Sequence, residues 1–228
     1  MDHTPTKRDS IQTTEPKRYD TMKHYKGKGE VAFVLLSGSS FQPFRATSRD
    51  EPIAVELAKH GTDVYAIDMC TTPWPEDVSH LPSCVLEAQQ LYNILCKEYS
   101  RIGILGISSG GFFAAIVARM VKARHLLLIA PILDPAQRPR SEERKWANQM
   151  AYFKTEKRIA QIRELHVEGS FPVDSMLLMG GNDSSAPREV ARPPWCNITI
   201  SSIHPDADHF FMVTGKCFMS RICSFLDY

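Results

Sequence analysis

The stretch "RIGILGISSGGFFAAI", residues 101–116, joins two apolar segments through a short run of small residues. Residues 101–107 are typical of a buried strand, and residues 111–123 are apolar on nearly all sides, which indicates a buried helix. Ser108 stands between them, with a glycine two residues before it and another two residues after it. This pattern indicates either a reactive hydroxyl on a sharp strand-to-helix turn or two buried elements joined by small residues.

Short apolar or β-branched runs also occur on both sides of this stretch. They are typical of strands buried on both faces, as in a parallel sheet. Segments with helical periodicity lie between most of them, and in the segment 85–99 we expect Leu86, Leu91, Ile94 and Leu95 to form one stripe. The alternation predicts an α/β fold with a mostly parallel central sheet and helices on both faces. The expected strands, besides 101–107, are 31–36, 63–68, 125–132, 175–180 and 197–203, and the expected helices, besides 111–123, are 49–61, 85–99 and 215–226.

Differences in polarity and in segment length divide the chain into an N-terminal arm, a domain and an insertion within that domain. Residues 1–29 are polar, with mixed charge and no apolar period, so they predict an N-terminal arm. Residues 30–228 predict a single domain. Within it, residues 133–173 exceed the length of a simple crossover and predict a small helical cap inserted before the penultimate core strand. The alternative for this interval is an ordinary crossover helix with a long loop.

The composition narrows the classes of function. The 228 residues carry a formal net charge of +1, which disfavours a nucleic-acid groove or an anionic membrane surface as partner. No apolar run is long enough to span a bilayer, and the first residues do not resemble a secretory signal, so we expect a cytoplasmic protein. The six cysteines and eight histidines lack metal-ligand spacing, and no dinucleotide or phosphate loop is present. We therefore expect no metal and no organic cofactor.

Polar residues follow the expected strands in an informative order. In open α/β sheets, ligands bind outside the carboxyl ends of the strands. Ser108 follows one strand, an acid follows a later strand, and a histidine follows the last, which is an arrangement for nucleophilic catalysis. The candidate acids are Asp183 and Asp134, and the candidate histidines are His209 and His204. Asp206 and Asp208 are too close in sequence to His209 for the usual geometry and are expected to be loop and capping residues.

Three motifs resemble the α/β-hydrolase superfamily, and the resemblance covers roughly residues 30–227. They are "GISSG" (106–110), "GGNDSS" (180–185) and "HPDADHFF" (204–211). The resemblance implies Ser108 as nucleophile, Asp183 as the triad acid and His209 as the base. It also implies an oxyanion hole made by the backbone amides of Ser109 and Ser39, with Ser40 as an alternative to Ser39. The family loop usually begins with His-Gly, whereas this chain has "SGSS" at 37–40.

These residues lead to three hypotheses of function. The first is a serine hydrolase that cleaves a carboxylic ester or thioester of a small or medium acyl substrate through an acyl-enzyme. The second is an acyltransferase or lactone-forming cyclase that uses the same triad. The third is a non-catalytic binding protein. Beside Ser108, an acyl pocket is expected from Ser40, Phe41, Trp74, Trp146 and Met150, although such aromatic residues also serve to pack an insertion onto a sheet. The sequence predicts no particular oligomeric state.

Overall fold

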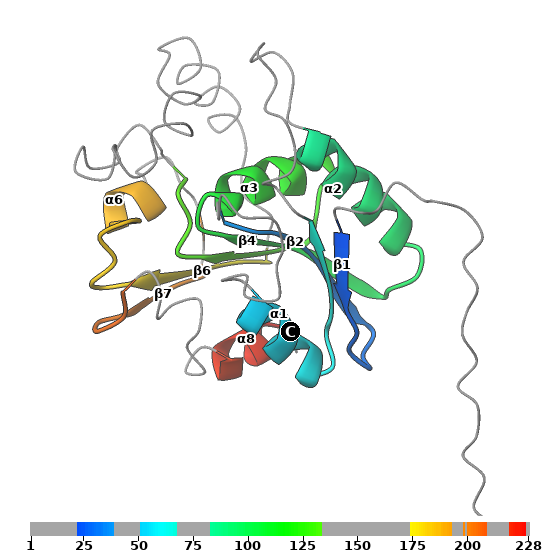
Figure 1. Ribbon diagram of the computed structural model, residues 1–228, viewed down its shortest axis with the longest axis horizontal. Coiled ribbons are helices and arrows are strands. Elements are labelled where there is room, and N and C mark those ends of the chain that lie inside the picture. Colours follow the sequence, from blue (N-terminus) through cyan, green and yellow to red (C-terminus); the bar gives the residue numbers. More distant parts are fainter. Residues whose placement is uncertain are drawn as a thin grey trace, which may run out of the picture.

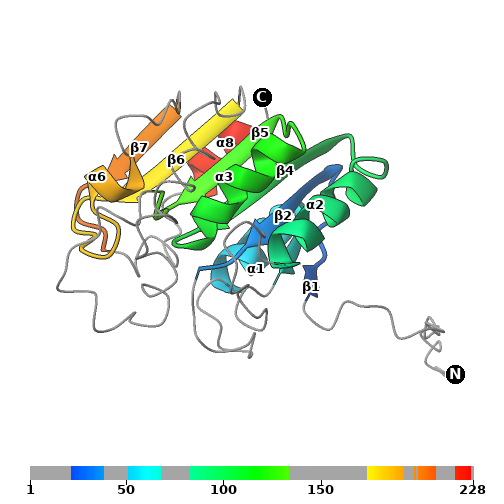
Figure 2. The same cartoon turned by 90° about the horizontal axis from the view of Figure 1, so that it is seen from above.

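The computed structural model describes residues 22–38, 51–67, 83–133, 174–192, 198, 200–208 and 219–226. Within this part of the chain, seven strands form one sheet in the order β1-β3-β2-β4-β5-β6-β7 (Figure 2). The strands are β1 (Met22–Tyr25), β2 (Val31–Leu36), β3 (Asp63–Ile67), β4 (Arg101–Ile107), β5 (His125–Ile129), β6 (Asp174–Gly180) and β7 (Ile200–His204).

All strand pairs are parallel except the pair β1–β3, which is antiparallel. The mostly parallel sheet predicted from the apolar runs is therefore confirmed. Three strands are shorter than expected: β3 ends at Ile67, β5 ends at Ile129, and β7 begins at Ile200. Strand β7 also departs from the prediction of burial on both faces, because Ile200 and Ile203 are each nearly half exposed.

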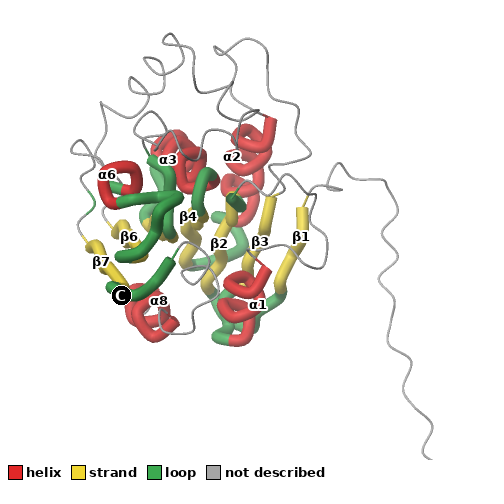
Figure 3. Tube along the Cα trace, turned by 60° about the vertical axis from the view of Figure 1, so that its left-hand side comes forward, coloured by secondary structure: helices red, strands yellow, loops and turns green. Residues whose placement is uncertain are grey.

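Helices cover both faces of the sheet, as predicted (Figures 1 and 3). Helices α2 (Ser83–Leu95), α3 (Gly110–Met120) and α6 (Arg188–Ala191) lie on one face, and α1 (Glu51–Lys59) and α8 (Met219–Leu226) lie on the other. Each face has its own apolar core: Phe113 packs in the α2–α3 layer, and Leu57 packs in the α1–α8 layer. Helix α3 is buried from Gly110 to Ala118, which explains its almost wholly apolar sequence.

The buried stripe of α2 differs from the predicted one. Leu91 and Leu95 are buried as expected, but Leu86 and Ile94 are exposed. At about 100° per residue, Leu86 projects almost opposite the buried face, and Ile94 also falls outside it. That face also includes smaller or less apolar residues, namely Cys84, Val85, Ala88 and Tyr92.

Strand β1 lies inside the segment that the sequence predicted to be a polar arm, residues 1–29. It pairs with β3 over the register Met22↔Ile67 to Tyr25↔Val64. Asp63 of β3 binds both this strand and the turn after it: its Oδ1 accepts hydrogen bonds from His24 Nε2 at 3.2 Å and from the Gly27 amide at 2.6 Å. Residues 22–29 therefore form an edge strand of the sheet and the turn that follows it.

The predicted insertion at 133–173 lies outside the described residues apart from residue 133. In the part of the chain that is described, no helix combines the length and apolarity that a membrane span requires.

Candidate active site

Ser108 adopts a backbone conformation that serine rarely takes. Its φ is +54°, in the left-handed region, which costs an L-residue about 1–3 kcal/mol and persists only where the surroundings hold it. Three backbone hydrogen bonds hold it here. Its N–H donates to the Ile129 carbonyl at 3.0 Å, and its carbonyl accepts from the amides of Gly111 at 3.0 Å and Ile132 at 2.9 Å. The junction between β4 and α3 is thus the sharp turn that the sequence indicated.

The two glycines that flank Ser108 allow close approach of the backbone. A Cβ on Gly110 would collide with the carbonyls of Leu36 and Ser37 at the end of β2. A Cβ on Gly106 would lie 2.6 Å from the Cα of Gly111 in α3. Neither glycine has a positive φ, so their role is steric, and the spacing in "GISSG" is explained by the packing of β2 and α3 around the turn.

The end of β2 lies directly against Ser108, which the sequence did not reveal. A Cβ on Gly38 would come within 2.9 Å of the Ser108 Cβ and 3.5 Å of its Oγ. Only a glycine allows the chain to pass this close to the serine. The glycine in "LLSGSS" is the signal that could have indicated this, but the strand that it must meet is seventy residues away in sequence.

Helix α3 begins immediately after this turn. Ser109 is its N-cap residue, with φ −61° and ψ −26°, and is buried. The first amides of a helix lack intrahelical acceptors, and the helix dipole favours negative charge near them. The turn therefore places Ser108 beside a group of donors that is suited to a developing oxyanion.

Asp183 is buried in the turn that follows β6, three residues beyond the last residue of that strand. Its Oδ1 accepts hydrogen bonds from the amides of Ser185 at 2.9 Å and Ala186 at 2.7 Å. These two bonds fix the orientation of the carboxyl group with respect to its own loop.

The turn after β6 is joined to the turn after β7. The Gly181 amide donates to the His204 carbonyl at 2.8 Å, and the Asn182 amide donates to the Ala207 carbonyl at 3.0 Å. The acid and histidine motifs of the sequence are therefore in direct contact through their backbones. His204 ends β7, and Asp206 and Asp208 are exposed in the following turn.

The turns after β2, β4, β6 and β7 all lie at the edge of the sheet that is formed by the carboxyl ends of the strands, because these strands are parallel. This edge carries Gly38, Ser108, Ser109, Asp183 and the turn at 205–208. The other candidate residues lie outside the described residues: His209 and Asp134 of the expected triad positions, Ser39 and Ser40 of the expected oxyanion loop, and Phe41, Trp74, Trp146 and Met150 of the expected acyl pocket. Among the residues that are described, no three His, Cys, Asp or Glu side chains gather as metal ligands.

Comparison with solved structures places this arrangement among known folds. The chain superposes on an acetyl ester-xyloside bifunctional hydrolase from Caldicellulosiruptor lactoaceticus, with a TM-score of 0.63 and 14% identity, over 93% of this chain and 92% of that one. A serine hydrolase without a lid from Xanthomonas campestris gives a TM-score of 0.60 at 14% identity, over 89% and 83% of the two chains. The chain has the α/β-hydrolase fold.

A third structure with this fold is an S-formylglutathione hydrolase from Agrobacterium tumefaciens, with a TM-score of 0.55 and 19% identity over 86% of this chain and 83% of that one. No family model and no curated protein sequence matches the chain. The likeness is one of architecture: the strand order and the superpositions establish the α/β-hydrolase fold.

Proposed function

We propose that this chain is a serine hydrolase that cleaves a carboxylic ester or thioester of a small or medium acyl substrate. The observation that carries the proposal is the left-handed conformation of Ser108, held by three backbone hydrogen bonds at the N-terminus of α3. A strained, over-determined residue between a strand and a helix is the expected arrangement of a nucleophilic serine in this fold. Two adjoining buried elements alone would not require the strain.

The proposed reaction begins with attack of the Ser108 Oγ on the acyl carbonyl carbon. His209 takes the serine proton and then gives it to the leaving alcohol or thiol. The amides of Ser109 and Ser39 donate to the oxyanion of the tetrahedral intermediate. Water, activated by His209, then hydrolyses the acyl-enzyme and releases the carboxylic acid.

Asp183 orients the histidine in this mechanism and stabilises its imidazolium form. Two features support this role. The Asp183 carboxyl group is buried and fixed through Oδ1, and its loop is hydrogen-bonded to Ala207, two residues before His209 in sequence. A carboxylate that is immobilised in this way can hold an imidazole in one tautomer.

Labelling with a fluorophosphonate tests the nucleophile directly. Folded protein should be labelled at one site, and peptide mapping should identify Ser108. The Ser108→Ala variant should not be labelled, whereas Ser100→Ala, which changes an exposed serine at the opposite end of β4, should be labelled as the wild type is. Labelling at another residue, or none in folded protein, contradicts the proposal.

A screen of p-nitrophenyl esters and acyl-thioesters of graded chain length then defines the substrate. Running the reaction in ¹⁸O-labelled water distinguishes hydrolysis from an acyl transfer or a cyclisation that uses the same residues. Hydrolysis places the label in the acid product, whereas transfer to a substrate hydroxyl or amine leaves it in water.

A further inference from the structure

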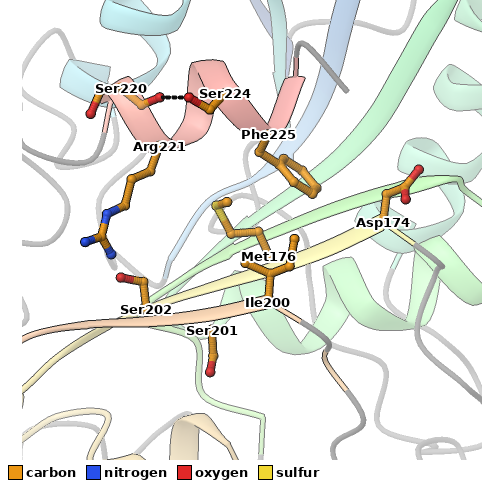
Figure 4. A pocket seen from close by; sticks show the side chains of 9 residues that line it. All are labelled: Asp174, Met176, Ile200, Ser201, Ser202, Ser220, Arg221, Ser224 and Phe225. Atoms are coloured by element: carbon orange, nitrogen blue, oxygen red, sulfur yellow. Dashed lines mark hydrogen bonds between the residues drawn. The ribbon is translucent and has the colours of Figure 1, made fainter.

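A pocket of about 660 Å³ lies between α8 and the β6–β7 part of the sheet (Figure 4). Its floor is formed by the first residues of β6 and β7, and its roof is formed by α8. The volume is in the range of pockets that bind small molecules. The lining side chains on which the following argument depends are Asp174, Met176, Ile200, Ser202, Arg221 and Phe225.

This pocket is separate from the candidate active site. Asp174 is the first residue of β6, and Asp183 follows the last residue of the same seven-residue strand. At about 3.3 Å per residue, the Asp174 end of the pocket is roughly 20 Å from the edge that carries Asp183. The pocket also lies on the α8 face of the sheet, whereas the turn at Ser108 leads into α3 on the opposite face.

The centre of the pocket is apolar. Met176 and Phe225 are buried, and Ile200 of β7 lines the same pocket (Figure 4). Ile200 is 46% exposed, although an aliphatic side chain of this size gains about 1.5–3 kcal/mol from full burial. A ligand with an apolar body would cover this surface.

The two ends of the pocket differ in charge. Arg221 extends from α8 toward the side on which Ser202 lies, and within the described part of the chain no acidic side chain is within ion-pair distance of its guanidinium. Asp174 lies at the other end. Its Oδ2 is 3.0 Å from Nε of Arg124 and 3.6 Å from Nδ1 of the buried His125. Because Arg124 balances the charge of Asp174, an anion is attracted chiefly to the Arg221 end.

We propose that this pocket binds an elongated amphipathic carboxylate, with the carboxylate group at Arg221 and Ser202 and the aliphatic chain along Met176, Ile200 and Phe225. The guanidinium donates to the carboxylate oxygens, and the Ser202 hydroxyl supplies a further donor. This binding does not require the hydrolase activity proposed above, so the two can be tested independently.

Calorimetric titration of full-length Ser108→Ala protein with sodium octanoate tests the proposal without turnover. Octanoate should bind, and octylammonium chloride, which has the same chain and the opposite charge, should bind at least about tenfold more weakly. Adding Arg221→Gln should weaken octanoate binding by about tenfold. The matched change Lys97→Gln, which neutralises an exposed cation in the turn after α2, should leave it unchanged.

A medium-chain carboxylate that bears a diazirine locates the site. On irradiation it should label peptides that contain residues 200–202 or 219–226, and Arg221→Gln should reduce this label. Equal binding of octanoate and octylammonium, an unchanged affinity in Arg221→Gln, or labelling confined to other segments overturns the proposal. A stable dimer in light scattering with no label in these peptides also overturns it, because a second copy of the chain then covers the pocket.

Discussion

The buried carboxylate of Asp63 connects β1, β3 and the turn after α2 through hydrogen bonds. Removing one of the donors that bind it should lower the free energy of unfolding by an amount that can be estimated. Asp63 Oδ2 accepts a hydrogen bond from the Tyr99 hydroxyl at 2.7 Å, and the Tyr99 hydroxyl is 2.8 Å from that of Tyr65. The substitution Tyr99→Phe leaves Oδ2 without this donor while the packing of the ring is kept. A hydrogen bond to a charged group contributes about 1.5–3 kcal/mol, so we expect a loss of about 2 kcal/mol in the free energy of unfolding at pH 7.

The same substitution should change the dependence of stability on pH. Burial acts to raise the pKa of Asp63, but hydrogen bonds from Tyr99, Gly27 and His24 outweigh it, and the pKa is lowered below 3.8. A lowered carboxyl pKa stabilises the folded state above the unfolded pKa and loses this contribution as the pH falls through the folded pKa. The difference between wild type and Tyr99→Phe should therefore be largest near pH 7 and should shrink below about pH 4.

Urea unfolding followed by circular dichroism at several pH values measures both effects. In thermal unfolding, a loss of about 2 kcal/mol corresponds to a fall of about 4–8 °C in Tm for a chain of this length. Tyr65→Phe is the matched control, because it removes a hydroxyl from the same cluster but keeps the bond from Tyr99 to Asp63, and we expect it to cost about 1 kcal/mol or less. The reasoning is refuted if the two variants are equally stable, or if the effect of Tyr99→Phe does not diminish in acid.

Three further predictions concern other parts of the molecule. Burial lowers the pKa of His125 below 6.5, so the free energy of unfolding of the wild type should fall as the pH drops below about 6.5. His125→Gln should flatten this pH dependence in urea titrations between pH 7.5 and 5.5, and an unchanged slope would show that other groups cause it. Gly38→Ala should reduce the rate of fluorophosphonate labelling about 10–100-fold, because its Cβ displaces Ser108 or the β2 turn, and a wild-type rate would show that this contact has no influence on the nucleophile. Asp183→Asn keeps an acceptor for the Ser185 and Ala186 amides and should fold normally, yet kcat on an active p-nitrophenyl ester should fall about 10²–10⁴-fold; retention of full activity would exclude Asp183 as the triad acid.

The central strands were predictable because each of them shows its burial in its own residues. Strands such as β2, β4 and β5 are covered on both faces, so each is a continuous apolar run. Strand β1, "MKHY", has no such signal, because partners far along the chain bind its side chains: His24 stacks on Tyr65 with 4.2 Å between ring centroids and donates to Asp63. No local pattern encodes contacts of this kind.

The stripe of α2 shows a different limit. Apolar residues were assumed to face the sheet, but Leu86 and Ile94 are exposed, whereas Cys84 and Tyr92 are buried. The buried face of a helix is set by the position of its neighbours, and α2 packs against both the sheet and α3. Periodicity therefore predicted that a helix forms here but assigned two residues to the wrong side.

The candidate site combines local and distant information in the same way. The left-handed backbone of Ser108 is held by Ile129 and Ile132, which belong to β5 and the segment after it, and the glycine at 110 is required by the carbonyls at the end of β2. Strand β4 lies between β2 and β5 in the sheet, so the segments after both neighbours must pass close to the turn that follows β4. If the same five residues "GISSG" followed an edge strand, which has a neighbour on one side only, they would form an ordinary turn. The strand order, rather than the motif alone, is what makes Ser108 a strained and well-positioned residue.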